Sequence, residues 1–197
     1  EFQIVRPNGE IRSIQSQSLV IRDGLGKPLK MFGLNRDVTE EKKNLQKIQE
    51  LNAYLETALE QSQAGIVIVD APNGDIKFAN QAALAIADRV KEEVVDNIDA
   101  SKYEIWGVAG LNGRPLEGKE FPIVKAMSEG KFIKEELLIL RPSGEKRIVL
   151  ANAAPIRRQD GSIIAGIVIF LDITEKHLLL EKIKAAQKQA EEAMMAK

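Results

Sequence analysis

The sequence predicts an α+β fold that is built on antiparallel sheet and partly repeated along the chain. Three observations predict it: strand-like runs joined by short turns, a segment that occurs twice, and a helical stretch after each copy of that segment. The chain has 197 residues, which suits one or two domains. It has no cysteine and a net charge of −1, which excludes disulfides, thiolate catalysis and the basic surface typical of nucleic-acid binders.

The repeat runs without a gap at one constant offset, the distance from residue 6 to residue 141. Arg6-Pro7-Asn8-Gly9-Glu10 returns as Arg141-Pro142-Ser143-Gly144-Glu145. Asp37-Val38-Thr39-Glu40 returns as Asp172-Ile173-Thr174-Glu175. A register kept over more than forty residues indicates two copies of one structural unit.

Each copy reads as three strands followed by a helix. The Pro-Asn-Gly and Pro-Ser-Gly stretches are turn signals between the first two strands. Only the second copy has a full upstream half, with an apolar, β-branched run and a short second strand before helical material. The expected elements are third strands at 29–37 and 163–172, upstream strands at 65–70 and 76–80, a helix from 81 and another at 121–128.

At this point the chain resembles the PAS domain family. The residues that carry the resemblance are Gly65–Asp70, Phe78–Ala83, Asn112–Leu116, the Arg-Pro-Ser-Gly-Glu hairpin and Asp172-Ile173-Thr174. The resemblance implies a five-stranded antiparallel sheet with helices on one face. It also implies a partial first PAS domain that contributes a three-stranded antiparallel sheet, together with connecting and exit helices.

The repeat and the resemblance give a domain plan. We expect the last three strands of a truncated first PAS domain at 1–39, a helical linker at 40–62, a complete PAS domain at 63–174 and an exit helix at 175–197. The first sheet then lacks covering helices, so the apolar face that holds Phe32 and Leu34 should pack on another copy of the chain.

Both helical stretches carry an apolar stripe. The spacing suits a parallel coiled coil, with Asn52 and Gln187 as polar register-setting positions, although one helix packed on its own domain would show the same pattern. The stripe positions are Leu45, Ile48, Asn52, Leu55 and Leu59 in the first helix and Leu180, Ile183, Gln187, Ala190 and Met194 in the second.

The Asp-x-Thr stretch that ends each copy lies where a strand gives way to a helix. Thr174 or Asp172 can accept hydrogen bonds from free amides of the first helical turn, which makes a helix cap the simplest interpretation. Asp37 and Thr39 occupy the same positions in the first copy. We expect these junctions to relay signals into the helices.

A register argument adds a charge pair to each junction. If residues 156 and 163 pair across the second hairpin, Asp172 lies opposite Arg147, and the same rule sets Asp37 opposite Arg12. Cross-strand ion pairs of this kind contribute about 0.2–1 kcal/mol. The hypothesis is that each pair couples the sheet to the helix that follows it.

The same register predicts which sheet face holds a pocket. With Arg147 outward, Leu150, Asn152, Ile167 and Ile169 face inward. A buried amide costs free energy unless it is hydrogen-bonded, so Asn152 needs a loop partner, Tyr103 or a small molecule. Tyr103 and Trp106 are candidates for an aromatic lid, and Asn80 is a pocket candidate that also fits a helix cap. The opposite face is apolar too, so an upstream helix or a partner subunit should cover it, which favours a dimer.

No cofactor is evident. The resemblance implies cysteine-linked flavin or coumaroyl chromophores in some members, and this chain has no cysteine to bind them. Haem in the family is usually held by a histidine facing the sheet, whereas the single histidine, His177, lies beyond the last strand. A noncovalent flavin, a small metabolite or an empty pocket remain as alternatives. No metal site is expected, because one histidine without partners does not form one.

The expected function is a sensory and signal-relay region of a larger protein, most similar to the input region of a bacterial sensor histidine kinase. Diguanylate cyclases and transcriptional regulators use similar input regions, and a stand-alone ligand-binding protein is the other alternative. We expect a homodimer formed through helices and sheet faces, and an effector domain in the same parent chain. We expect no catalysis, no nucleic-acid partner, no membrane segment in this stretch and a cytoplasmic location.

Overall fold

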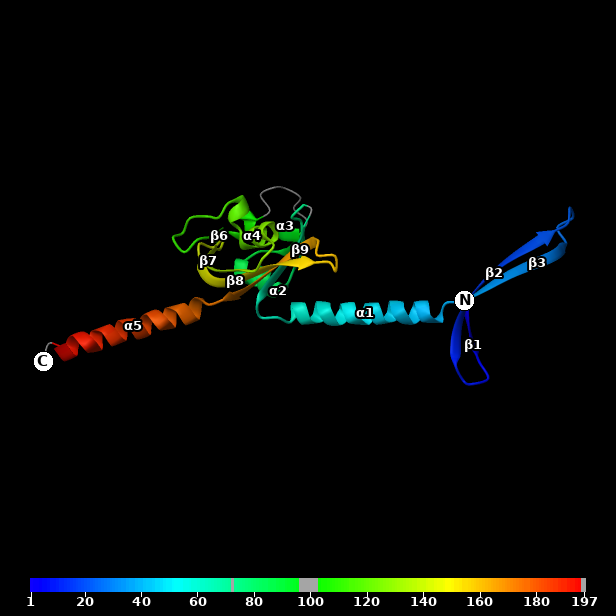
Figure 1. The fold of residues 1–197 in the computed structure, drawn as a ribbon, viewed down its shortest axis with the longest axis horizontal. Coiled ribbons are helices and arrows are strands. Elements are labelled where there is room, and N and C mark those ends of the chain that lie inside the picture. Colours follow the sequence, from blue (N-terminus) through cyan, green and yellow to red (C-terminus); the bar gives the residue numbers. More distant parts are fainter. Residues whose placement is uncertain (72, 96–102, 196–197) are drawn as a thin grey trace. The chain divides into compact units, whose positions relative to one another are not determined.

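The structure is a computed structural model, and it describes residues 1–71, 73–95 and 103–195. The chain divides into two compact units, Glu1–Thr57 and Ala58–Lys197. Each unit contains its own antiparallel sheet. Figure 1 shows the elements of both units in sequence colours.

The first unit is a three-stranded sheet followed by a long helix. The strands β1 (Phe2–Val5), β2 (Ile11–Arg22) and β3 (Pro28–Asp37) pair in chain order, and α1 spans Thr39–Glu60. Gly9 and Gly26 lie in the two connecting turns at φ +82°, a left-handed conformation that glycine adopts without steric cost. The expected order of three strands and a helix is confirmed.

The second unit contains a curled sheet of six strands. The strand order is β5-β4-β9-β8-β7-β6, so the first two strands lie beside the last one. Five of the strands were expected from the sequence, and the sixth, Val108–Ala109, is a two-residue strand on the edge beside β7. The strands are β4 (Gly65–Asp70), β5 (Ile76–Ala79), β6 (Val108–Ala109), β7 (Ile133–Leu140), β8 (Lys146–Arg157) and β9 (Ile163–Asp172).

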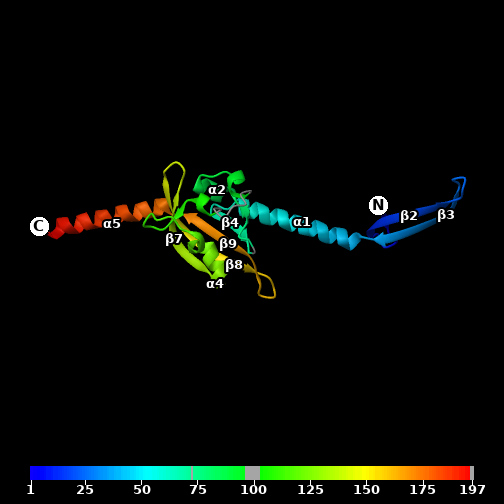
Figure 2. The ribbon, with the colours of Figure 1, turned by 90° about the horizontal axis from the view of Figure 1, so that it is seen from above.

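Short helices cover one face of this sheet. Helix α2 contacts β4, and α4 contacts β7, β8 and β9, as Figure 2 shows for α4. The core lies between these helices and the strands. The helices are α2 (Gln81–Ala87), α3 (Lys91–Val95), the 3-10 turns η1 (Glu104–Trp106) and η2 (Gly118–Glu120), α4 (Pro122–Glu129) and the exit helix α5 (Thr174–Met195).

The register across the β8–β9 hairpin differs by two residues from the expected one. Val149, and not Arg147, is the partner of Asp172. Arg157 pairs with Ile163, and a bulge between Ile156 and Arg157 shifts the remaining pairs by one further residue. The first hairpin has an equivalent shift, because Ile14 is the partner of Asp37.

The two sheet faces are the reverse of those expected. Val149, Ala151, Val168 and Phe170 face the helices, so Arg147 and Asp172 share the covered face. The charged pair lies at the end of the strands, where the helices no longer cover the sheet and water reaches it. The expectation was wrong because it took a charged pair as the mark of the solvent face, although both faces are apolar.

Candidate functional site

The exit junction joins β9 to α5 through the side chains of Asp172 and Thr174. The Asp172 carboxylate accepts a hydrogen bond from the Thr174 amide at 2.9 Å and so caps the first turn of α5. The Thr174 hydroxyl accepts instead from the backbone amide of Ile148 in β8, at 2.8 Å. Asp172 therefore supplies the cap, while Thr174 ties the start of the helix to the neighbouring strand.

The expected ion pair is present at this junction. Arg147 Nη1 lies 3.2 Å from Asp172 Oδ2. The two residues are diagonal neighbours on adjacent strands, a geometry that long side chains can bridge. A second carboxylate joins them, since Glu145 Oε1 lies 2.8 Å from Arg147 Nη2. Both Arg147 and Asp172 keep a quarter or more of their side-chain surface exposed, so the pair contributes at most about 1 kcal/mol.

The first unit contains the same junction at the same offset. Arg12 Nη1 lies 3.5 Å from Asp37 Oδ2, and Arg12 Nη2 lies 2.6 Å from Glu10 Oε1. Thr39 donates to Asp37 from its amide at 3.0 Å and accepts from the Ser13 amide at 2.8 Å. The two glutamates, Glu10 and Glu145, were missed as junction residues, although the aligned Arg-Pro-x-Gly-Glu segments contain both of them.

Asp37 should remain ionised at a lower pH than an ordinary aspartate does. The Thr39 hydroxyl and amide, followed by the Arg12 guanidinium, hold the pKa of Asp37 below its ordinary value of 3.8. Because the folded-state pKa is the lower one, the stabilisation is complete above 3.8 and is lost as the pH falls through the lowered value. A carbon-13 NMR titration should give a midpoint below 3.8, and Thr39→Ala should raise it. A midpoint of 3.8 or higher in the unmodified chain would contradict this assignment.

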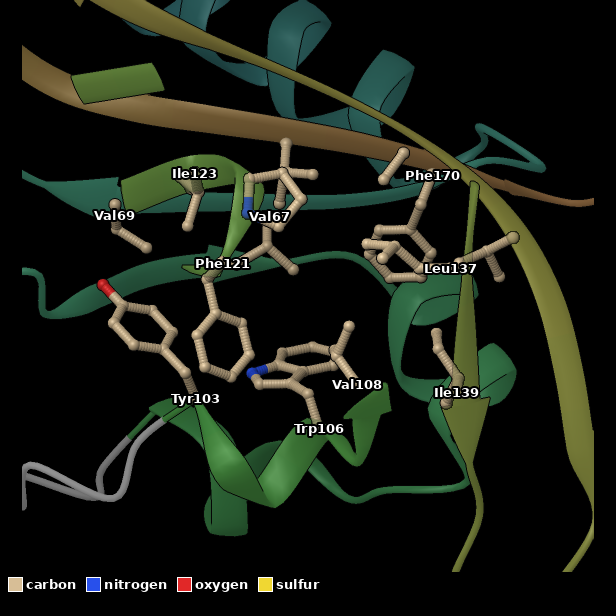
Figure 3. Close-up of a pocket in the computed structure, with 14 residues that line it drawn as sticks. Val67, Val69, Tyr103, Trp106, Val108, Phe121, Ile123, Leu137, Ile139 and Phe170 are labelled. Atoms are coloured by element: carbon tan, nitrogen blue, oxygen red, sulfur yellow. The ribbon is translucent and has the colours of Figure 1, made fainter. Parts of the chain in front are cut away.

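A cavity of about 60 Å³ lies between the sheet and the helices of the second unit. Its wall is almost wholly apolar, and Figure 3 shows the rings of Tyr103, Phe121 and Trp106 in a row along one side of it. Pockets that hold drug-sized ligands measure about 300–1,000 Å³. The cavity is therefore too small for a flavin unless its walls move apart. The lining residues are Val67, Val69, Tyr103, Trp106, Val108, Phe121, Pro122, Ile123, Leu137, Ile139, Val149, Ala151, Val168 and Phe170.

Aromatic contacts hold the helical side of the cavity. The Tyr103 and Phe121 ring centroids are 5.3 Å apart, and the Trp106 ring meets Phe170 edge-on at 6.2 Å. The Tyr103 hydroxyl donates to the Gly74 carbonyl at 2.8 Å. Burial, and after it the charge of Asp75, raises the pKa of Tyr103, so this hydroxyl stays protonated and keeps its donor. Tyr103 and Trp106 thus lie in the cavity wall, where the sequence placed them.

The other pocket candidates lie elsewhere. Leu150, Asn152, Ile167 and Ile169 are on the opposite face of the sheet, because of the reversed faces described above. Ile169 is 38% exposed there. The side-chain amide of Asn152 has no hydrogen bond within the described ranges of the chain, and it is half-exposed, so water can satisfy it.

Asn80 is fully buried, but its amide is already saturated. Its Oδ1 accepts from the Ala83 amide at 2.9 Å, the expected cap of α2, and from the Ile66 amide at 2.8 Å. Its Nδ2 donates at 2.9 Å to the carbonyls of Leu59 and Ala64. No hydrogen-bonding capacity remains for a ligand, so Asn80 is not a pocket residue.

The described residues include no cluster of three or more His, Cys, Asp or Glu side chains arranged to hold a metal ion. Among the same residues, no helix is long and apolar enough to cross a membrane. His177 lies in the first turns of α5, where its amide donates to the carbonyl of Ile173.

The second unit is an α+β domain whose antiparallel sheet and covering helices enclose an apolar cavity. The sequence model of the PAS domain matches residues 63–175, more than half of the chain. The chain belongs to the PAS domain family. PAS domains are generally sensory and not catalytic, and membership gives this chain a role in sensing or signal transduction.

Solved structures share the fold at low sequence identity. An RNA-binding light-oxygen-voltage receptor is 18% identical, with a TM-score of 0.54, over 88% of this chain and 44% of that one, so this chain spans less than half of its length. The PAS domain of an HTR-like protein from Haloarcula marismortui is 21% identical, with a TM-score of 0.50, over 67% of this chain and 99% of that one. No curated protein sequence matches the chain.

Proposed function

We propose that the chain is the sensory and relay region of a larger signal-transduction protein, with a two-component sensor histidine kinase as the favoured parent. In this proposal residues 1–39 are the last three strands of a first PAS domain and 40–62 are a helical linker. Residues 63–174 are a complete second PAS domain, and 175–197 lead to an effector domain. Relay through the Asp-x-Thr junctions is the activity proposed for the chain.

The repeated junction is the observation that carries the proposal. In both copies an arginine, a glutamate, an aspartate and a threonine take the same positions. In each copy the arginine forms ion pairs with the glutamate and the aspartate, the threonine amide donates to the aspartate, and the threonine hydroxyl accepts from a strand amide. A helix cap alone needs only the aspartate, so the cap does not explain why the arginine and the glutamate recur. The bonds link the sheet to the first turn of a helix, so a change in the sheet would reach the helix there.

Dimer formation through the helices is part of the proposal. The stripe residues Leu45, Ile48 and Leu55 of α1 are each more than half exposed, and Leu180 and Ile183 of α5 are nearly so. An apolar stripe in a parallel coiled coil would be covered by the same stripe of a second copy. The exposed Ile169 and Leu171 on the outer sheet face offer a further apolar contact.

Single-cysteine crosslinking tests this proposal cleanly, because the chain has no cysteine of its own. Ile183→Cys lies on the α5 stripe and should form a disulfide-linked dimer under mild oxidation. Lys182→Cys, one position off the stripe, is the matched control and should crosslink much less. In the double variant Arg147→Ala with Ile183→Cys, the yield of disulfide-linked dimer should differ from that of Ile183→Cys alone. Sedimentation should still show a dimer. A monomer in sedimentation, or equal yields at both positions, would refute the dimeric relay.

A further inference from the structure

A polar ladder, which we define as Arg141, Glu145, Arg147 and Asp172, runs across one end of the second unit. Arg141 Nη1 bonds to Glu145 Oε2, and Glu145 Oε1 lies 2.8 Å from Arg147 Nη2. Arg147 continues to Asp172 at 3.2 Å, and Asp172 caps α5. The ladder thus ends on the first turn of the exit helix.

The other end of the ladder is anchored on helix α2. Arg141 Nε donates to the Ile86 carbonyl at 3.0 Å, and its Nη2 donates to the Ala85 carbonyl at 2.9 Å. These carbonyls belong to the last turn of α2, where acceptors lack a full set of intrahelical partners. The Ala85 carbonyl also accepts from the Asp88 amide at 3.4 Å. A guanidinium there is favourable for its charge as well as for its hydrogen bonds. The Arg141 side chain is only 16% exposed, which fixes its position.

The first turn of α2 is attached in turn to the end of α1. Asn80 caps α2 and donates to the Leu59 carbonyl, while the Gln81 amide donates to Glu60 Oε2 at 3.0 Å. Residues 58–60 of α1 belong to the second unit, so these bonds lie within one compact body. Bonds therefore run without interruption from the end of α1, through α2 and the ladder, to the start of α5.

This path avoids the cavity. None of Asn80, Arg141, Glu145, Arg147 and Asp172 lines the cavity wall, and all of them are linked through polar atoms. The first unit repeats the ladder, because Arg6 lies 3.3 Å from Glu10 and Glu10 lies 2.6 Å from Arg12. One arginine paired with the glutamate would be enough to close the hairpin. The hairpin alone therefore does not explain why each glutamate contacts two arginines.

We propose that the second unit transmits a displacement of α1 to α5 along this ladder without requiring an occupied cavity. The second unit then passes a signal that arises upstream from α1 to α5, in addition to any response to its own ligand. The proposal rests on the relay function given above and specifies its route. Helix α2 is the middle link of this route, since its first turn is bonded to the end of α1 and its last turn to Arg141.

Amide hydrogen exchange of the 197-residue chain tests the route. Arg141→Ala should speed exchange in the last turn of α2 and in the first turn of α5 by about threefold to tenfold, the effect of losing one hydrogen-bonded link. Glu145→Gln, which cuts the ladder in the middle, should speed exchange at α5 and leave α2 protected. Thermal melting confirms that each variant is folded.

Arg157→Ala is the matched control. Arg157 also extends from a hairpin to the end of a helix, donating to the Gly130 carbonyl at the end of α4 and to the Gly161 carbonyl, each at 2.8 Å. It has no link to Asp172 among the residues that the structure describes, so α5 should exchange as in the unmodified chain. If Arg147→Ala speeds exchange at α5 and Arg141→Ala does not, the proposed transmission from α2 along the ladder is refuted. The proposed relay through the Asp-x-Thr junction is then retained. If neither variant speeds exchange at α5, both proposals fail.

Discussion

Replacing Asn80 with alanine should destabilise the second unit by about 3–5 kcal/mol, among the largest effects of any single substitution in the chain. The side chain is fully buried and makes four hydrogen bonds. Its removal strands the amides of Ile66 and Ala83 in a water-poor site. Each buried group left without a partner costs about 1–3 kcal/mol.

Urea unfolding followed by tryptophan fluorescence measures this effect in the right unit, because the only tryptophan, Trp106, lies in the second one. Asn80→Ser keeps a cap for α2 but is too short to reach the Leu59 carbonyl, so its cost should be intermediate. Asn112→Ala is the matched control: Asn112 is exposed and accepts one hydrogen bond, from the Arg114 amide. A cost below about 1 kcal/mol for Asn80→Ala would show that the four bonds do not hold the unit together.

Sequence reasoning reached the succession of strands along the chain and the junction ion pairs because both depend on spacing. The repeat supplied the strands, and Arg147 and Asp172 come within reach of each other in either register, since long side chains bridge diagonal neighbours. Because the ion pair forms in either register, its presence does not reveal that the expected register was wrong by two residues. The bulge at Ile156 leaves no mark in the sequence, and strands that are apolar on both faces do not reveal which face the helices cover.

The cavity wall was predictable only in part, for a related reason. Tyr103 and Trp106 were found because large aromatic residues between helices pack against a core. Leu150, Asn152, Ile167 and Ile169 were predicted to face the cavity, whereas they lie on the opposite face of the sheet. The cap that Asn80 provides for α2 was predicted, but its other three bonds depend on Leu59, Ala64 and Ile66 coming close in space, which no periodicity in the sequence encodes.

Replacing Gly65 with alanine should also destabilise the second unit strongly, by about 2–4 kcal/mol. A Cβ at Gly65 would lie 2.4 Å from Cε2 of Phe170 and 2.9 Å from the Cα of Ala83, and neither is the end of a flexible side chain. Gly65 pairs with Phe170 across β4 and β9, so the ring is held in place by the sheet as well as by Trp106. The cost is steric, because the φ of Gly65 is one that other residues adopt.

A double-mutant cycle separates this contact from general damage. Phe170→Ala alone should cost about 3–5 kcal/mol, because it leaves a space beside the existing cavity. The double variant should cost less than the sum of the two single variants by more than about 1 kcal/mol, since the new methyl group no longer meets the ring. Unfolding is best followed by circular dichroism, because Phe170 contacts the fluorescent Trp106.

Gly113 supplies the control for the cycle. A Cβ there would meet nothing within 4 Å, so Gly113→Ala strains only its own backbone at φ +81° and should add to Phe170→Ala without coupling. Additivity for Gly65 as well would mean that the β4 backbone moves away from the ring at little cost.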